Sequence, residues 1–318
     1  MQIGIIGAGA VGSATAFALM MKGVARKITL VDVNEKKALA EAMDIAHAAP
    51  FADAGKIKAG NYEDLKDCDI IVVTAGFGQR QGESRTDLLE RNVKIYAEIV
   101  PQIVRFVPDA IFIIATNPVD IMTYVTFRLS SLPQEHVIGS GTVLDTARFR
   151  TDLGYHLGIS PKSIHANVLG EHGDSEVLCW SNGDAGTLSL EVLAQKIGCS
   201  LTDNVKNKID DDVRQAAYRI IEGKGATYYG IAGAIVRICQ AISSNEYAIL
   251  TISSFHPDIA GVEKVFLSMP SVVGKRGIHN ILYPDLDAKE QIKLKQSAEK
   301  IKKLMNDADA ILADINAL

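Results

Sequence analysis

Two polar stretches of the chain carry side chains suited to proton transfer and carboxylate binding. In residues 170–175, a glycine-bearing loop holds His172, and a histidine, whose ordinary pKa is about 6.5, can give or take one proton near neutral pH. In residues 142–150, Asp145 and Arg148 are three positions apart, so on a helix they project to one side. Asp145 can hydrogen-bond a ring nitrogen of His172, and Arg148 can hold a substrate carboxylate with a two-pronged guanidinium. A structural loop histidine and a surface ion pair of little energetic weight are the alternatives.

A third polar stretch, residues 77–85, follows a buried apolar run and contains two glycines. Its position suggests a lid. Closing such a lid over a ligand expels water and brings Arg85 to a reacting oxygen, where a preorganised cation lowers the barrier. An ordinary solvated loop is the alternative, and the lid is favoured because the other two polar stretches are present.

The chain begins with a pattern typical of dinucleotide binding. Residues 2–6 form an apolar run of strand length, which is followed at once by Gly7, Gly9 and Gly12 and then by a helix-forming stretch. Gly7 permits a tight turn, Gly9 leaves room for a pyrophosphate, and Gly12 lets the helix lie close to the strand. Asp32 follows at the distance where a carboxylate accepts the ribose hydroxyls and repels a 2′-phosphate, which favours NAD(H) over NADP(H). A glycine-rich turn without a ligand is the alternative.

Strand and helix patterns alternate through the first part of the chain. Predicted strands lie at residues 2–6, 27–33, 56–59, 69–74, 111–115 and 136–139. Predicted helices lie at residues 13–22, 34–49, 87–107 and 119–129. This alternation predicts an α/β fold with a Rossmann-type, doubly wound parallel sheet, in which ligands bind at the carboxyl ends of the strands.

The pattern changes after residue 140, where the helices lengthen and the strands alternate apolar with polar residues. Predicted helices lie at residues 144–157, 210–243, with interruptions at Gly223 and Gly225, and 287–312. Predicted strands lie at residues 164–169, 176–181, 247–253, 264–273 and 278–282, the last three antiparallel. We therefore expect an NAD-binding domain at residues 1–140 and an α+β substrate domain at residues 141–318.

The composition excludes several classes of ligand. The 318 residues carry a formal net charge of −5 and 47% of them are hydrophobic, which is typical of a globular protein that binds neither nucleic acid nor an anionic membrane. No apolar run approaches the roughly 20 residues that span a bilayer, and the N-terminus enters a strand without a targeting segment, so we expect a cytoplasmic location. The four cysteines are far apart, which predicts free thiols and neither disulfides nor a zinc site; no metal site is expected.

The chain resembles the lactate and malate dehydrogenase family over essentially its whole length. The motifs that match are Gly-Ala-Gly-Ala-Val-Gly at 7–12, Thr-Ala-Gly at 74–76, Gly-Glu-Ser-Arg at 82–85, Thr-Asn-Pro-Val-Asp at 116–120, Leu-Asp-Thr-Ala-Arg at 144–148 and Gly-Glu-His-Gly-Asp at 170–174. The resemblance implies reversible hydride transfer between NADH and a 2-oxo acid.

The same resemblance implies roles for individual residues. His172 is then the proton donor and acceptor, Asp145 its partner and Arg148 the carboxylate anchor. Arg85 polarises the substrate carbonyl, and Asn117 orients the substrate oxygen. Contacts with NAD are implied for Gly7, Gly9, Ala10, Val11, Gly12, Asp32, Thr74, Ala75, Gly76, Asn117, Ser140 and Ile231, of which the last two border the nicotinamide.

Two positions bear on the choice of 2-oxo acid. In this family a glutamine at Gln79 goes with pyruvate, whereas an arginine there pairs the second carboxylate of oxaloacetate. Thr227 fits the family position beside the substrate side chain and leaves room for little more than a methyl group. The resemblance therefore favours the L-lactate dehydrogenases, which reduce pyruvate to (S)-lactate in fermentation. The alternatives are a malate dehydrogenase in which Arg80 takes the loop position, a broader L-2-hydroxy acid dehydrogenase, and a module that senses NADH without turnover.

A second ligand site is implied away from these residues. Arg150 lies about 200° around the helix from Arg148, so the two cannot share a site. In bacterial lactate dehydrogenases activated by fructose 1,6-bisphosphate, an arginine and a histidine at the positions of Arg150 and His165 bind the phosphates across a subunit interface. The resemblance thus implies a homotetramer and an allosteric anion site, and surface residues without function are the alternative.

Overall fold

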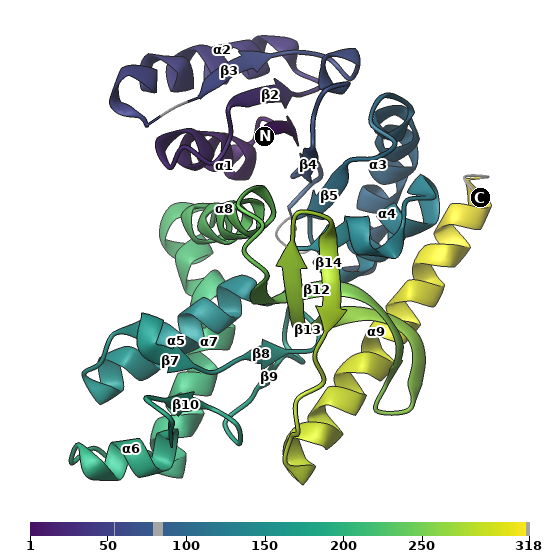
Figure 1. Cartoon of the computed structure of the whole chain (residues 1–318). Coiled ribbons are helices and arrows are strands. Elements are labelled where there is room, and N and C mark those ends of the chain that lie inside the picture. The colour runs from purple at the N-terminus through teal and green to yellow at the C-terminus, as the bar shows by residue number, and fades with distance from the viewer. Residues whose placement is uncertain (54, 79–84, 316–318) are drawn as a thin grey trace.

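The computed structural model describes residues 1–53, 55–78 and 85–315 of the chain. Within these residues the largest feature is a nine-stranded sheet with the strand order β14-β13-β12-β6-β5-β4-β1-β2-β3 (Figure 1). The parallel strands are β1 (Gln2–Ile6), β2 (Lys27–Val31), β3 (Lys56–Ala59), β4 (Ile70–Val73), β5 (Ile111–Ile114) and β6 (Val137–Gly139). The strand order reverses between β1 and β4, as in a doubly wound sheet, so the predicted Rossmann-type fold is confirmed.

Helices cover both faces of the parallel strands, which explains why those strands are apolar throughout. In β4, Ile70 and Val72 join one core cluster, whereas Ile71 and Val73 join another on the opposite face. The covering helices are α1 (Ala10–Met21), α2 (Glu35–His47) and α8 (Tyr229–Ser243) on one face, and α3 (Arg85–Phe106), α4 (Val119–Ser130) and α9 (Ala288–Asp314) on the other.

The antiparallel strands of the second half join the sheet of the first half. β12 (Ala248–Ile259) pairs with β6 at Ser253 and Gly139, so that β12, β13 (Val262–Gly274) and β14 (Gly277–Ile281) extend the parallel sheet. This pairing covers a strand edge whose backbone groups would otherwise lack partners. A Cβ at Gly139 would lie 2.7 Å from the Cβ of Ser253, so the close approach requires glycine there.

Several element boundaries also differ from the prediction. The strand predicted at 164–169 is two short strands. The helical tract predicted at 210–243 is two helices; the predicted interruption at Gly225 is confirmed, because Gly225 with φ of +82° ends the first helix, whereas Gly223 lies within that helix. Helix α6 and strands β10 and β11 were not predicted. The elements of this region are α5 (Val143–Leu157), β7 (Ile164–His165), β8 (Val168–Leu169), β9 (Val177–Leu178), β10 (Asp184–Ala185), β11 (Leu188–Ser189), α6 (Leu190–Lys196) and α7 (Asp203–Lys224). Short 3-10 helices lie at Ala49–Phe51, Glu63–Leu65, Gln134–His136 and Pro161–Ser163.

Helix α9 packs against both halves of the chain (Figure 1). It begins with a capping box formed by Asp287 and Glu290, and its apolar stripe, which includes Ile301 and Met305, is buried. The helix packs against α3 and α4 from the first half and against β13 from the second. No helix in the described ranges combines the length and the apolar character that crossing a membrane requires.

A buried histidine on β12 makes the stability of the fold dependent on pH. His256 is fully buried, with Nε2 3.1 Å from the carbonyl oxygen of Leu267, and burial lowers its pKa to about 4. The unfolded chain therefore binds a proton here below about pH 6.5 that the folded chain does not bind, and the free energy of unfolding falls by about 2 kcal/mol between pH 7.5 and pH 5. The His256→Gln variant, measured by urea denaturation at both pH values, is expected to lack this part of the loss. Parallel losses in the two proteins would contradict this assignment.

Candidate active site

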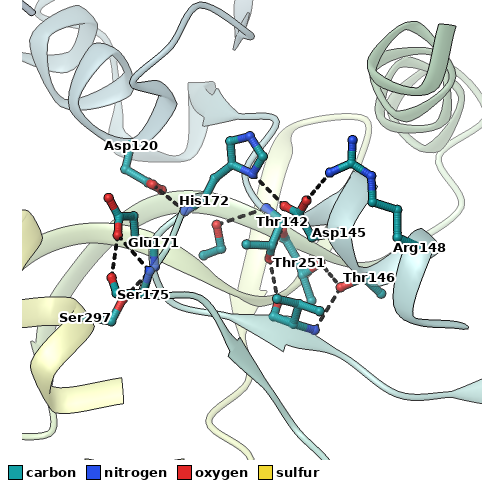
Figure 2. Close-up of polar contacts among 12 residues, drawn as sticks. Asp120, Thr142, Asp145, Thr146, Arg148, Glu171, His172, Ser175, Thr251 and Ser297 are labelled. Atoms are coloured by element: carbon teal, nitrogen blue, oxygen red, sulfur yellow. Dashed lines mark hydrogen bonds and ion pairs between the residues drawn. The ribbon is translucent and has the colours of Figure 1, made fainter. Parts of the chain in front are cut away.

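A histidine, a buried carboxylate and an arginine meet in the second half of the chain (Figure 2). Helix α5 carries Asp145 and Arg148 one turn apart, and His172 lies in the loop after β8. Nδ1 of His172 lies 2.6 Å from Oδ2 of Asp145, and Nη1 of Arg148 donates to Oδ1 of Asp145 at 2.8 Å. The side chain of Asp145 is 2% exposed, whereas that of His172 is 24% exposed. The hydrogen bond expected between Asp145 and His172 is therefore present.

The charges of this cluster favour a protonated His172. Burial opposes the charged ring, but the charge and the hydrogen bond of Asp145 outweigh burial and raise the pKa of His172 to about 9. Burial likewise acts against the charge of Asp145, yet His172 and Arg148 hold the pKa of this carboxyl below its usual range. Because Nδ1 is engaged by Asp145, the proton on Nε2 is the one that His172 can give to a ligand.

Hydrogen bonds from two other helices hold the histidine loop in place. Asp120 at the start of α4 accepts the backbone N–H of His172 at 2.8 Å. The backbone N–H of Glu171 donates to Oγ of Ser297 on α9 at 2.8 Å, and its carboxylate pairs with Nζ of Lys300 at 2.6 Å. Sequence reasoning assigned no role to Asp120 or Glu171, although both belong to the matching motifs. Their burial, at 2% and 7% exposed, is the signal that a sequence does not display.

Hydrogen bonds of three threonines hold the start of α5 beside the histidine loop (Figure 2). The hydroxyl groups of Thr146 and Thr251 lie 2.9 Å apart, and Oγ1 of Thr146 accepts the backbone N–H of Val168 on β8 at 2.9 Å. Oγ1 of Thr142 donates to the carbonyl oxygen of the same Val168 at 2.5 Å. The helix that carries Asp145 and the strand that precedes His172 are thus fixed to each other.

The glycines at the start of the chain leave the space that a pyrophosphate needs. Gly7 has φ of +105°, and a Cβ at Gly12 would lie 1.9 Å from the carbonyl oxygen of Gly7, so α1 approaches β1 this closely only with glycine. A Cβ at Gly9 would meet no described atom within 4 Å, so the backbone is open to a ligand there. Helix α1 begins at Ala10 and Val11, where unpaired N–H groups favour an anion.

Asp32 and Thr74 lie beside the glycine turn, at the carboxyl ends of β2 and β4. The carboxylate of Asp32 accepts two backbone N–H groups, from residue 8 at 2.6 Å and from residue 34 at 2.8 Å. The hydroxyl of Thr74 donates to the carbonyl oxygens of residues 6 and 7, and Ala75 and Gly76 continue from the end of β4. Asp32 is thus held in a fixed direction beside the open backbone, as binding of a ribose requires, and the residues present fit NAD.

The remaining predicted contacts come from several elements. Ser140 follows β6 and is buried, whereas Ile231 on α8 is partly exposed and packs on the same core cluster as Val11. Asn117 is exposed before α4, and Thr227 is partly exposed between α7 and α8. In the described part of the chain no hydrogen bond joins either of these last two side chains to His172.

Two predicted residues fall where the structure gives no side chain, and two others lie apart from the cluster. Gln79 lies outside the described residues, as does the side chain of Arg85, whose backbone begins α3. Arg150 and Arg148 have different hydrogen-bond partners. Nε of Arg150 donates to the carbonyl oxygen of Ala166 at 2.8 Å. His165 is exposed on β7 and immediately precedes that residue.

The position of Asp32 gives a test of cofactor choice. In the Asp32→Ser variant, we expect discrimination against NADPH to fall by roughly 10²-fold, because a carboxylate facing a 2′-phosphate costs several kcal/mol. The ratio of kcat/KM for NADH to that for NADPH measures the effect. The Asp44→Ser variant on the exposed face of α2 is the matched control, and an unchanged ratio in the Asp32 variant would contradict the assignment.

Known proteins share the sequence of both halves. Residues 1–139 match the family model for the NAD-binding domain of lactate/malate dehydrogenases, and residues 142–312 match the model for their alpha/beta C-terminal domain. An L-lactate dehydrogenase of Thermus aquaticus is 52% identical over 302 residues, which cover 95% of this chain and 97% of that relative. An L-lactate dehydrogenase of Allorhizobium ampelinum is 50% identical over 304 residues, or 96% and 98% of the two chains.

Solved structures share the architecture. A lactate dehydrogenase from a Medee basin deep-sea metagenome library has a TM-score of 0.93 and 39% identity, over 97% of this chain and 98% of that one. The minor L-lactate dehydrogenase of Enterococcus mundtii in a ligands-bound form has a TM-score of 0.92 and 37% identity, over 96% and 97%. The chain therefore belongs to the lactate/malate dehydrogenase family of NAD-dependent oxidoreductases, and the relatives that it matches here are lactate dehydrogenases.

Proposed function

We propose that the chain interconverts pyruvate and (S)-lactate with NAD as its redox partner, as the L-lactate dehydrogenases do in fermentation. The observation that carries this proposal is the cluster of His172, Asp145 and Arg148, which joins a proton donor to a guanidinium. Reduction of a 2-oxo acid needs both groups, because its carbonyl oxygen must gain a proton while its carboxylate is held. In this proposal residues 1–140 bind NAD and residues 141–318 bind the substrate.

The residues of the cluster have separate tasks in the reaction. Bound NADH supplies the hydride that the carbonyl carbon of pyruvate accepts. Arg148 holds the carboxylate with the donors that Asp145 does not engage, and protonated His172 donates its Nε2 proton to the carbonyl oxygen. Arg85 is proposed to polarise that carbonyl and Asn117 to orient its oxygen. In lactate oxidation neutral His172 takes the proton back, so reduction consumes one proton and pH sets the direction.

Pyruvate is the proposed 2-oxo acid because of two residues. A glutamine at Gln79 leaves the second carboxylate of oxaloacetate without a compensating charge in a desolvated site, and that costs binding energy. Thr227 is proposed to limit the substrate side chain to little more than a methyl group. The relatives at 50% and 52% identity are L-lactate dehydrogenases, which supports the same choice.

NADH oxidation at pH 7 with pyruvate, oxaloacetate and 2-oxoisocaproate in parallel tests this proposal. We expect kcat/KM for pyruvate to exceed the other two by at least roughly 10²-fold, since each mismatch leaves a buried charge unpaired or overfills the site. Oxaloacetate as the best substrate would instead assign the loop position to Arg80 and make the chain a malate dehydrogenase.

We also propose a homotetramer in the cytoplasm with an anion site for fructose 1,6-bisphosphate. A cavity of about 280 Å³ is lined in part by Arg150, Lys162, Asn167 and Arg237, so three cationic side chains border it. Free thiols at all four cysteines suit a reducing compartment. Sedimentation measures the oligomeric state and tests the homotetramer. Activation is tested by measuring the apparent KM for pyruvate with and without the bisphosphate between pH 5 and pH 8. An unchanged KM throughout would remove the allosteric site from the proposal.

A further inference from the structure

A second carboxyl group lies close to His172 and Asp145. Glu176 follows His172 by four residues, directly before β9, and is 4% exposed. One ligand atom from each of Glu176, Asp145 and His172 can be chosen so that all three lie within 4.8 Å of one another. Oε1 of Glu176 has no hydrogen-bond partner among the described residues.

The neighbouring Glu171 shows what a structural carboxylate looks like in this loop. Oε2 of Glu171 accepts the hydroxyl of Ser175 and pairs with Nζ of Lys300, so its charge is compensated. Glu176 is buried to a similar extent, its Oε1 has no such partner among the described residues, and burying a charged carboxylate in this way is unfavourable. Stability of the loop therefore does not explain Glu176, whereas its closeness to His172 points to the reaction.

We propose that Glu176 is a positioning residue of the proton-transfer centre, whose buried carboxyl group controls the charge of the adjacent His172. This role rests on the proposed function, in which His172 transfers a proton. Burial and the charge of Asp145 raise the pKa of Glu176 to about 8, which agrees with this geometry.

The sign of the effect follows from the charges around the pair. Among the described residues, the ionisable groups whose charges act on His172 and Glu176 are Asp145 and Arg148 on α5, Asp120 on α4 and Arg214 on α7. Below about pH 8 Glu176 is neutral and adds no charge. Above that pH its negative charge favours the imidazolium form, and removing this charge lowers the pKa of His172.

The Glu176→Gln variant separates this role from a structural one, because glutamine mimics the neutral acid. We expect kcat/KM for pyruvate reduction to match that of the unmodified protein within about threefold below pH 7, and the alkaline decline to begin roughly one pH unit lower. The Glu263→Gln variant, on the exposed part of β13, is the control and should leave the alkaline decline in place. A rate loss of equal size at every pH, or a decline that does not move, would overturn the proposal.

Infrared spectroscopy of the unliganded, unmodified protein tests the inference without any turnover. A carbonyl band of a protonated carboxylic acid is expected to persist at pH 7 and to vanish as the pH rises through about 8. Absence of that band at pH 7 would overturn the proposal even if the Glu176→Gln variant did not fold. A protein that shows the band but does not reduce pyruvate would keep the buried acid and refute the proposed function instead.

Discussion

We expect the His172→Gln variant to reduce pyruvate roughly 10²- to 10⁴-fold more slowly than the unmodified protein, which is the usual contribution of a positioned acid. The ring of His172 carries the proton that is proposed to reach the carbonyl oxygen, since Asp145 is engaged by both of its neighbours. Single-turnover oxidation of NADH at pH 7 measures the loss. NADH affinity, measured by fluorescence, should change less than about threefold, because the cofactor contacts come from other elements.

A matched histidine provides the control for this substitution. His156 lies in the last turn of α5, on the same helix as Asp145, and its Nε2 is 2.9 Å from the carbonyl oxygen of Ser200. The His156→Gln variant keeps a donor at that place and should keep its rate. Equal rates in the two variants would mean that His172 does not transfer the proton. If the unmodified protein binds NADH but does not reduce pyruvate, the chain would be an NADH sensor.

The cofactor half of the site was predictable because its residues are close in the sequence. The spacing of Gly7, Gly9 and Gly12 fixes a strand, a turn and a helix, and the steric limit at Gly12 is a local one. The apolar run of β4 predicts a strand buried on both faces, since alternate residues face opposite clusters. Local patterns of this kind do not depend on the rest of the chain.

The joining of the two halves was not predictable from such patterns. The β6 and β12 strands meet at one residue pair, Ser253 and Gly139, and a single pair leaves no periodic signal in either segment. Strands of two residues, such as β7 and β8, are too short to show an alternation of period two.

The pairing of Asp145 with His172 was predictable although the two residues are far apart in the sequence, because their chemistry suits a hydrogen bond between them. Glu176 was missed for the opposite reason. A glutamate at the end of a predicted strand, next to a polar loop, is typical of a solvent-exposed surface, and only the packing of the folded chain shows that this one is buried.

Replacing Arg148 should have the second large effect, through both the substrate and Asp145. The Arg148→Gln variant removes the group proposed to hold the substrate carboxylate and leaves Asp145, which is 2% exposed, with His172 as its remaining charged partner. Loss of one member of a buried charge pair costs about 2 to 5 kcal/mol, so kcat/KM for pyruvate should fall roughly 30- to 4,000-fold. Steady-state kinetics measure this loss.

The pattern of recovery distinguishes carboxylate binding from a loss of charge alone. Arg148→Lys keeps the charge but not the planar fork, so it should recover only part of the loss. The Arg219→Gln variant, on the exposed side of α7 where Arg219 pairs with Asp211, should keep its kcat/KM. If Arg148 binds the carboxylate before the chemical step, the affinity for oxamate, an unreactive carboxylate analogue of pyruvate, must fall together with kcat/KM. An unchanged oxamate affinity would place the carboxylate elsewhere and leave Arg148 as a partner of Asp145 only.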